Sequence, residues 1–533
     1  MDKCTNDLVG RDAAVLRVRG ALAFTDATKP GAGALADAAI LIRDGKIAEV
    51  GVATDPATID PRALEIGGEL YWIIPGLVNA HSHGRGLGWF RLGAADDALE
   101  PWICQILAQP GLNPYLDTVY QNLRLIAAGV TTVLHSHYPR NPADAGETEA
   151  TLRAYADTGL RVGFAASLFT RNFFSYDDTA FLKILPVSLR ERAARLGRAD
   201  ATTADRFFAE VRRLTERYSV GGRGAPAVRI LHGPVAPQWV TPEELARCRR
   251  EADELGGGVH MHLLETPYQS AWAWREYGRP WAVELARQGI LGSNVSLAHA
   301  VWTDDADLSC MAEHGVTVCH NPSSNLRLKN GLAPVARMRA RGIRVALGGD
   351  NSILGGEEDM LAEMRLCANL HRQPGFEAAA PRAEEVLAMA TVAGAHAAGF
   401  GDTIGRITVG AAADLVLLRH ERITHPFLAP ESSLIDALLH VASARDVETV
   451  IIGGEIVYHA GHWHNFDLKQ VEAELAQQAA LGLPRRDEAA DLFRALVPYR
   501  RQFEGRLFDD SAHYRYNAIA SESNPVRMRG GDC

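Results

Sequence analysis

The stretch Pro75-Gly76-Leu77-Val78-Asn79-Ala80-His81-Ser82-His83 decides how this chain is interpreted. It is an apolar run that predicts a strand, and it ends in two histidines separated by one residue. Side chains alternate between the faces of a strand, so His81 and His83 point to the same side and Ser82 to the other. Two imidazoles on one face at a strand end are half of a site for a first-row metal ion. Alone the pair indicates little, because exposed histidines in a loop would have the same spacing.

Length and composition limit the class of protein. The chain has 533 residues, which suits one large α/β barrel plus an accessory unit. Its net charge is −10 with no basic stripe, which argues against a nucleic-acid partner or an anionic membrane surface. No run is apolar and long enough to span a bilayer, and no signal-peptide h-region opens the chain. The 7 cysteines show no paired spacing, so we expect free thiols and a cytoplasmic location.

Two β passages enclose a long α/β middle. Residues 38–50, with a turn at Asp44-Gly45, and residues 447–458, with a turn at Gly453-Gly454, predict two hairpins. Between about 72 and 400, apolar strands alternate with helix-like segments, as in a parallel barrel. The predicted strands after the opening stretch are 131–134, 161–165, 228–231, 258–263, 295–299, 315–318 and 344–348.

The predicted fold is α/β, a (β/α)8 TIM-like barrel with two additions. The barrel is expected over 73–404. Both chain ends, 1–72 and 405–466, are expected to form a small β-sandwich domain. Residues 467–533 are expected to be a helical C-terminal extension, because 471–481 and 488–496 have an amphipathic pattern.

Polar residues suited to metal and proton chemistry lie at four predicted strand ends, where the catalytic groups of such a barrel collect. They are His81, His83, His262, Glu265, His299 and Asp350. Three imidazoles and a carboxylate around an open position match a catalytic zinc or iron site that keeps a water. Buried histidines are often ordinary core residues, but the placement of each candidate at a strand end favours a functional site.

The segments that contain these residues resemble the amidohydrolase superfamily, specifically its cytosine deaminase-like and S-adenosylhomocysteine deaminase/chlorohydrolase-like branch. The resemblance covers about residues 12–460. The segments that carry it are 75–83, 129–133, 260–266, 297–299, 320–328, 347–350, 405–407 and 410–416. They are specific for the superfamily and say little about the substrate.

The resemblance implies one divalent metal ion, with zinc favoured and iron or manganese as alternatives. Its ligands would be His81, His83, His262 and Asp350. Glu265 would be the proton-transfer carboxylate, and His299 would hold the attacking water or the developing oxyanion. His260 is interpreted as structural, because Glu265 follows His262 at the family's spacing.

A second metal ion is disfavoured. Relatives with two ions bridge them with a carboxylated lysine at a middle strand end. The only lysine between His83 and His262 is Lys183, in a segment that predicts a loop or helix. The site is therefore expected to hold one ion.

Five further residues are candidate substrate contacts, namely Trp89, Trp102, His135, His137 and Gln238. The tryptophans could stack on a planar heterocycle or simply pack the loop after the first strand. The histidines could line the pocket or bond to neighbouring loops. Some deaminase relatives carry a substrate-binding histidine near Gln238, and its absence here puts a nucleoside substrate in doubt.

The sequence therefore predicts a metal-dependent hydrolase that deaminates a planar nitrogen heterocycle with release of ammonia. The resemblance also implies a homo-oligomer. One alternative is displacement of another leaving group, such as chloride from an s-triazine. The other is a catalytically silent homologue with a binding role, which would be expected to have lost part of the metal set.

Overall fold

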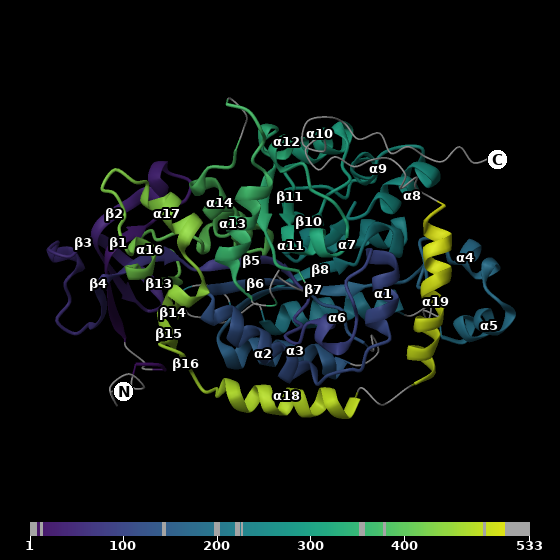
Figure 1. The fold of residues 1–533 in the computed structure, drawn as a ribbon, viewed down its shortest axis with the longest axis horizontal. Coiled ribbons are helices and arrows are strands. Elements are labelled where there is room, and N and C mark those ends of the chain that lie inside the picture. Colours follow the sequence, from purple (N-terminus) through teal and green to yellow (C-terminus); the bar gives the residue numbers. More distant parts are fainter. Residues whose placement is uncertain are drawn as a thin grey trace.

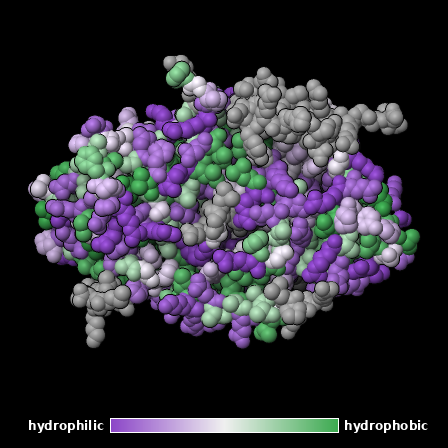
Figure 2. All heavy atoms as spheres, in the orientation of Figure 1, coloured by the Kyte–Doolittle hydropathy of each residue, from purple (hydrophilic) through white to green (hydrophobic). Residues whose placement is uncertain are grey.

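Two sheets of eight strands organise this chain. The computed structural model describes residues 8–10, 14–140, 145–196, 203–218, 224, 227–350, 356, 358–376, 380–482 and 487–506. One sheet is a parallel barrel surrounded by helices, and the other is a mixed sheet at one side of the barrel (Figure 1). Hydrophilic residues cover much of the face seen in Figure 2, with hydrophobic residues among them in small groups.

The barrel is built of eight parallel strands in chain order. They are β5 (Leu77–Ser82), β6 (Val130–Ser136), β7 (Arg161–Leu168), β8 (Val228–Pro234), β9 (Val259–Leu263), β10 (Val295–His299), β11 (Thr317–His320) and β12 (Arg344–Leu347). The first and last strands meet, because the backbone N–H of Asp350 donates to the carbonyl of His81 at 2.8 Å. The predicted strands and the predicted barrel are confirmed, and closure makes the ends of β5 and β12 neighbours.

Helices connect the strands and cover the outside of the barrel (Figure 1). They are α2 (Pro114–Ala127), α3 (Ala145–Thr158), α6 (Thr203–Tyr218), α7 (Pro242–Glu254), α8 (Pro267–Tyr277), α9 (Trp281–Arg287), α10 (Asp305–Glu313), α11 (Pro322–Arg327), α12 (Val335–Ala340), α13 (Met360–Leu370), α14 (Ala383–Met389) and α15 (Val392–Ala397). Helix α7 begins with a capping box, in which Thr241 and Glu244 exchange side-chain and backbone hydrogen bonds.

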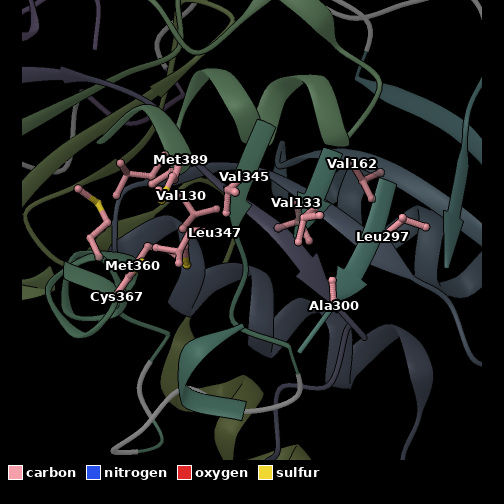
Figure 3. Close-up of a cluster of buried hydrophobic side chains, with 14 of the residues drawn as sticks. Val130, Val133, Val162, Leu297, Ala300, Val345, Leu347, Met360, Cys367 and Met389 are labelled. Carbon is pink, nitrogen blue, oxygen red and sulfur yellow. The ribbon is translucent and has the colours of Figure 1, made fainter. Parts of the chain in front are cut away.

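Apolar side chains fill the space between the strands and the helices. Figure 3 shows Val345 and Leu347 of β12 close to Met360 and Cys367 of α13. Strands buried on both faces need apolar residues at nearly every position, which is why these segments are continuous apolar runs in the sequence. Histidines and carboxylates lie at the carboxyl ends of several of these strands.

The second sheet takes strands from both parts of the chain that flank the barrel. They are β1 (Val15–Phe24), β2 (Ala34–Arg43), β3 (Lys46–Val52), β4 (Leu64–Pro75), β13 (Leu415–Arg419), β14 (Val447–Ile452), β15 (Glu455–His459) and β16 (His462–Trp463). Leu415 and Leu417 join the core of this sheet, whereas Val416 and Leu418 pack on the barrel core. Ile42 of β2 and Ile456 of β15 belong to the same apolar core. The sheet therefore curls around this core, as a small sandwich requires.

Two helices follow the second sheet. Helix α18 (Leu468–Gly482) lies along α2, and α19 (Glu488–Glu504) lies beside α1 (Leu99–Leu107), α4 (Asp178–Ile184) and α5 (Val187–Leu196) (Figure 1). The expected helical extension is confirmed for these two segments, whereas 507–533 lie outside the described residues. No helix in the described part of the chain has the length and apolar character to cross a bilayer.

Candidate metal and active site

The six residues predicted from strand ends come together at one end of the barrel. Strands β5, β9, β10 and β12 position them at or just beyond their last residues. They are His81, His83, His262, Glu265, His299 and Asp350. All are buried except His83, which is partly exposed.

The donor atoms of four of these side chains lie at the separations that one ion requires. His83 Nε2 is 3.4 Å from His262 Nε2 and 3.2 Å from Asp350 Oδ1. His81 Nε2 is 3.5 Å from the same Asp350 oxygen. Ligands bound tetrahedrally to zinc at about 2.0–2.1 Å stand about 3.3–3.4 Å from one another. These four residues therefore fit one divalent ion.

The hydrogen bonds of the imidazoles turn Nε2 lone pairs toward this position. Nδ1 of His83 is 2.8 Å from the carbonyl oxygen of Ser136, and Nδ1 of His262 is 2.8 Å from that of Val235. A carbonyl only accepts, so each Nδ1 carries the hydrogen and each Nε2 has a free lone pair. His81 Nε2 is buried and has no hydrogen-bond partner among the described residues. A buried polar atom needs a partner, and a bound ion would provide one.

His260 lies behind His81. Its Nε2 is 2.8 Å from His81 Nδ1, and its own Nδ1 is 2.8 Å from Ser296 Oγ. Although His260 shares a strand face with His262, its ring is used to orient a neighbouring imidazole. This placement agrees with its interpretation as a structural residue.

Burial and neighbouring charges give these groups the protonation states of metal ligands. Burial, followed by the neighbouring histidines, lowers the pKa of His81 and His262 well below 6.5. Burial alone would raise the pKa of Asp350, but its contacts with the His83 and His299 side chains and a 2.5 Å hydrogen bond from Ser324 Oγ hold that pKa below its usual range. Neutral imidazoles and an ionised carboxylate are the forms that bind a metal ion.

Glu265 lies beside the group in a state suited to carrying a proton. Burial, followed by the negative charges of Asp350 and Glu100, raises its pKa well above that of an ordinary glutamate. Its Oε2 is 3.8 Å from His299 Nε2, and its Oε1 accepts a 2.8 Å hydrogen bond from Asn330. A carboxyl group that keeps its proton near neutral pH can act as a general acid.

His299 offers a fourth imidazole to the same space. Its Nδ1 is 2.9 Å from Asn325 Oδ1, so in the neutral ring Nε2 is an acceptor. That Nε2 has no hydrogen-bond partner in the described part of the chain and is 4.0 Å from Asp350 Oδ2. Burial lowers the pKa of His299, and the charge of Asp350 and the bond to Asn325 only partly oppose that shift. His299 can therefore accept a proton or approach an ion, and it donates from Nε2 only as imidazolium.

The backbone is strained at three of the strand ends. Leu264 (φ 51°), His299 (φ 73°) and Asp350 (φ 55°) have left-handed backbone conformations, which are uncommon for residues other than glycine. Such strain clusters at functional sites. Here it lies where the chain must turn the side chains of Glu265, His299 and Asp350 toward one another.

The predicted aromatic contacts are mainly packing residues. Trp102 is buried, and it packs with Leu99 and Leu328 in a small apolar cluster. Trp89 is partly buried against that cluster, and the Arg85 guanidinium lies 5.9 Å from the centre of its ring. The structure therefore does not bring Trp102 to an open surface.

His135 and His137 bond to neighbouring elements. His135 Nδ1 is 3.0 Å from the Tyr155 hydroxyl, and His137 Nε2 is 3.2 Å from Thr148 Oγ1. Both rings are buried, and the chain passes so close to His135 that a Cβ on Gly84 would be 2.2 Å from its Cε1. Both partners lie on α3, so the two histidines bond to a helix outside the strands and not to the neighbouring loops that were expected as the alternative.

Two predicted contacts have buried side-chain atoms without hydrogen-bond partners among the described residues, namely Nε2 of His135 and both polar atoms of the Gln238 amide. Gln238 is buried in the loop after β8, and neither its side-chain nitrogen nor its oxygen has a hydrogen-bond partner among the described residues. A buried amide without partners is costly, so it calls for a further group to bond with.

Three residues around the site carry no role in the sequence-based prediction. Glu100 of α1 accepts hydrogen bonds from Tyr176 and Thr266, and Asn330 and Ser324 bond to Glu265 and Asp350. Only Ser324 lies in a segment that carried the resemblance. No local spacing connects Glu100 or Asn330 to the strand ends, so the sequence offered no signal for them.

A second buried cluster of potential ligands does not fit an ion as well. His320 of β11 meets Cys367 and His371 of α13. The Nε2 atoms of the two histidines are 2.9 Å apart, a hydrogen-bond separation shorter than the about 3.3–3.4 Å between ligands of a tetrahedral ion. Cys367 also belongs to the apolar core shown in Figure 3.

Lys183, the lysine weighed for a second ion, lies on α4 with an exposed side chain. It is not at a strand end. The structure therefore places it where a bridge between two ions is not expected.

Comparison with known proteins gives consistent matches. The sequence model of the amidohydrolase family matches residues 72–457. The 5-methylthioadenosine/S-adenosylhomocysteine deaminase of Desulfitobacterium hafniense is 30% identical over 417 residues, which cover 76% of this chain and 85% of that protein. The 5'-deoxyadenosine deaminase of Methanosarcina mazei is 29% identical over 456 residues, covering 85% and 94%.

Solved structures share the fold. A zinc-bound adenosine deaminase from Xanthomonas campestris superposes with a TM-score of 0.73 at 24% identity, covering 88% of this chain and 99% of that one. A zinc complex of atrazine chlorohydrolase from Arthrobacter aurescens gives 0.74 at 23% identity, covering 87% and 100%. At these identities the structures confirm the barrel architecture alone.

Proposed function

Since the chain belongs to the amidohydrolase family and is a hydrolytic enzyme that uses a divalent metal ion, we propose that it deaminates a planar nitrogen heterocycle. The ion is held by His81, His83, His262 and Asp350, and zinc is favoured over iron or manganese. One observation carries the proposal. His83 Nε2 lies within 3.4 Å of His262 and 3.2 Å of Asp350, and the buried Glu265, whose pKa burial raises, lies beside His299.

A bound divalent ion would act as a Lewis acid and lower the pKa of a water molecule from 15.7 to about 7. The remaining steps belong to protein side chains. Asp350, ionised in this site, accepts a proton from the water as its oxygen attacks the carbon that bears the amino group. Glu265 gives its proton to the adjacent ring nitrogen, so the carbon becomes tetrahedral without a separated negative charge on the ring.

The second half of the reaction returns both protons. Asp350 passes its proton to the leaving amino group, the carbon–nitrogen bond breaks and ammonia departs. Glu265 recovers a proton from the new hydroxyl, which becomes the ring carbonyl. His299 holds the water or the developing oxygen charge, because its Nε2 faces both Glu265 and Asp350 at 3.8 and 4.0 Å.

Adenosine-type compounds are the first substrates to test. The two relatives described above are named as deaminases of adenosine derivatives, at 30% and 29% identity. This chain differs from some such relatives at the loop of Gln238, whose unpartnered amide would bond to polar groups of a ring or its substituent. Free bases without a ribose therefore belong in the same panel.

The test is an assay of the metal-loaded protein against aminated purines, their nucleosides, pyrimidines, pterins and triazines, with ammonia and chloride measured in parallel. Ammonia release that is lost in Glu265→Gln supports the proposal. Chloride release from a chlorinated triazine, with no ammonia from any amine, would support the alternative chemistry, for which the fold shared with atrazine chlorohydrolase is the relevant observation. A silent homologue predicts neither product.

Three further properties are proposed with this function. The division into a barrel over 73–404, a small domain from 1–72 and 405–466, and an extension over 467–533 follows the expected fold. A cytoplasmic location agrees with the free thiols of Cys104, Cys248, Cys310, Cys319 and Cys367. A homo-oligomer follows from the family resemblance, and size-exclusion chromatography with light scattering measures it directly.

A further inference from the structure

The last described helix carries a charged pair into the interior. Arg500 and Glu504 of α19 are 3% and 2% exposed, with Nε and Oε1 3.3 Å apart. Arg500 also donates through Nη1 to the carbonyl of Phe174. Burying an arginine against a carboxyl group is a poor way to stabilise a fold, because desolvation offsets their attraction, and burial raises the pKa of Glu504 to about 8. The presence of this pair on a helix that already has apolar anchors points to another role.

Those apolar anchors are sufficient to dock the helix. Leu492, Leu496 and Phe503 of α19 pack with Cys104 of α1 and Phe181 of α4. Leu496 is fully buried. Other polar contacts at the surface, such as Arg494 Nη2 to the carbonyl of Ala108 at 2.9 Å, also hold α19 on α1.

Arg500 bonds to the carbonyl of Phe174, two residues before Tyr176, whose hydroxyl donates to the buried Glu100, and the charge of Arg500 acts on that carboxyl group. Burial raises the pKa of Glu100, and the hydrogen bonds from Thr266 and Tyr176 and the charge of Arg500 oppose that rise. One oxygen of Glu100 accepts both bonds, from Thr266 Oγ1 at 2.6 Å and from the Tyr176 hydroxyl at 2.7 Å. Its other oxygen, Oε2, is buried without a hydrogen-bond partner in the described residues.

A short chain of contacts runs from Glu100 to the catalytic carboxylate. Thr266 directly follows Glu265 in sequence and is the residue before α8. The side-chain oxygen of Gln269 accepts a 3.0 Å bond from the backbone N–H of Glu265, and its nitrogen is 3.5 Å from the Tyr176 hydroxyl. Glu100 and Tyr176 therefore hold the segment 265–269 from two sides.

We propose that α19 is part of the active-site architecture and that Arg500, with Glu504, is a positioning residue for Glu265 through Glu100, Tyr176 and Thr266. Arg500 supplies the positive charge that lets Glu100 accept two hydrogen bonds in a buried site. With Glu100 fixed, the turn after β9 holds the Glu265 carboxyl beside His299. The family match ends at residue 457, so this contribution lies beyond the part of the chain that the family describes.

The inference rests on the proposed function for its effect on rate, but its structural part can be measured without a substrate. In Arg500→Met, hydrogen exchange of backbone amides in 265–269 should become faster than in the wild type. Arg494→Met is the matched control, because it removes an arginine from the same helix without touching Phe174 or Glu100. It should leave exchange in 265–269 unchanged.

Kinetics provide the second readout. Arg500→Met should lower kcat by up to about 100-fold, since misplacing a catalytic group by about 1 Å has that effect, while KM and metal content change little. Arg500→Lys, which keeps the charge, should recover most of the rate. If Arg500→Met does not fold, Tyr176→Phe removes the shared hydroxyl with little change in volume and should act in the same direction.

Unchanged exchange in 265–269 in Arg500→Met or in Tyr176→Phe would overturn the inference, and so would faster exchange with an unchanged kcat. A wild-type protein that releases no ammonia from any amine overturns the proposed function instead. In that case the exchange measurement alone decides whether Arg500 positions this segment.

Discussion

His83 Nε2 lies 3.4 Å from Nε2 of His262, although the two residues belong to strands on different sides of the barrel. A direct contact between two lone pairs at this distance is unfavourable, and the bonds from Nδ1 to Ser136 and Val235 prevent either ring from turning a hydrogen toward the other. A cation between the rings removes the conflict. This contact is the physical basis of the metal site and of the predictions below.

His262 and His260 provide a matched pair of variants, because both are buried on the same face of β9. Removal of His262 takes away a ligand, so His262→Gln should retain far less than one metal ion per chain after dialysis. His260→Gln removes only the hydrogen bond that orients the His81 ring. Loss of such an orienting partner typically lowers the affinity for the metal ion by about 10–100-fold. Inductively coupled plasma mass spectrometry measures both. If His262→Gln kept all of its metal and His260→Gln lost it, His260 and not His262 would be the ligand.

Glu265→Gln should separate catalysis from metal binding. The amide cannot donate the acidic proton, so kcat should fall by about 10²–10⁴-fold with the metal content unchanged. Glu284→Gln is the control for the loss of a buried carboxylate, since Glu284 lies on α9 and pairs with Arg287. Its activity should stay close to that of the wild type. Equal losses in both variants would count against a specific proton-transfer role.

The fold and the convergence of the proposed metal ligands were predictable because each follows a local rule. Strands buried on both faces require apolar runs, and metal chemistry requires histidine or carboxylate where those runs end. Glu100 and Asn330 follow no such rule, because Glu100 lies on α1 and Asn330 in the segment after α11, both far in sequence from the groups they contact. The pair His135 and His137 has the same spacing as His81 and His83, yet it bonds to Tyr155 and Thr148. Spacing alone does not say what surrounds a strand end.

Metal affinity should fall by clearly less than tenfold between pH 8 and pH 6. Burial lowers the pKa of His81 and His262 well below 6.5, so both rings stay neutral over this range and need not lose a proton when the ion binds. Two histidines with the ordinary pKa of about 6.5 would instead reduce the affinity by on the order of tenfold at pH 6. Competition with a chelator at several pH values distinguishes the two, and a tenfold decrease by pH 6 would contradict the buried, neutral state.

Gln238→Leu should weaken substrate binding without destabilising the fold. The amide is buried without a partner among the described residues, so its replacement by an apolar side chain of similar size should leave the melting temperature equal or higher. If the amide serves the substrate, KM should rise. A lower melting temperature with an unchanged KM would show that Gln238 is a structural residue.

The most direct test of the metal site is an anomalous difference map, recorded at the zinc edge from crystals of the zinc-loaded protein. The geometry predicts one strong peak among Nε2 of His81, His83 and His262 and the carboxylate of Asp350. A peak at His320, Cys367 and His371 instead, or no peak among the four predicted ligands, would contradict it.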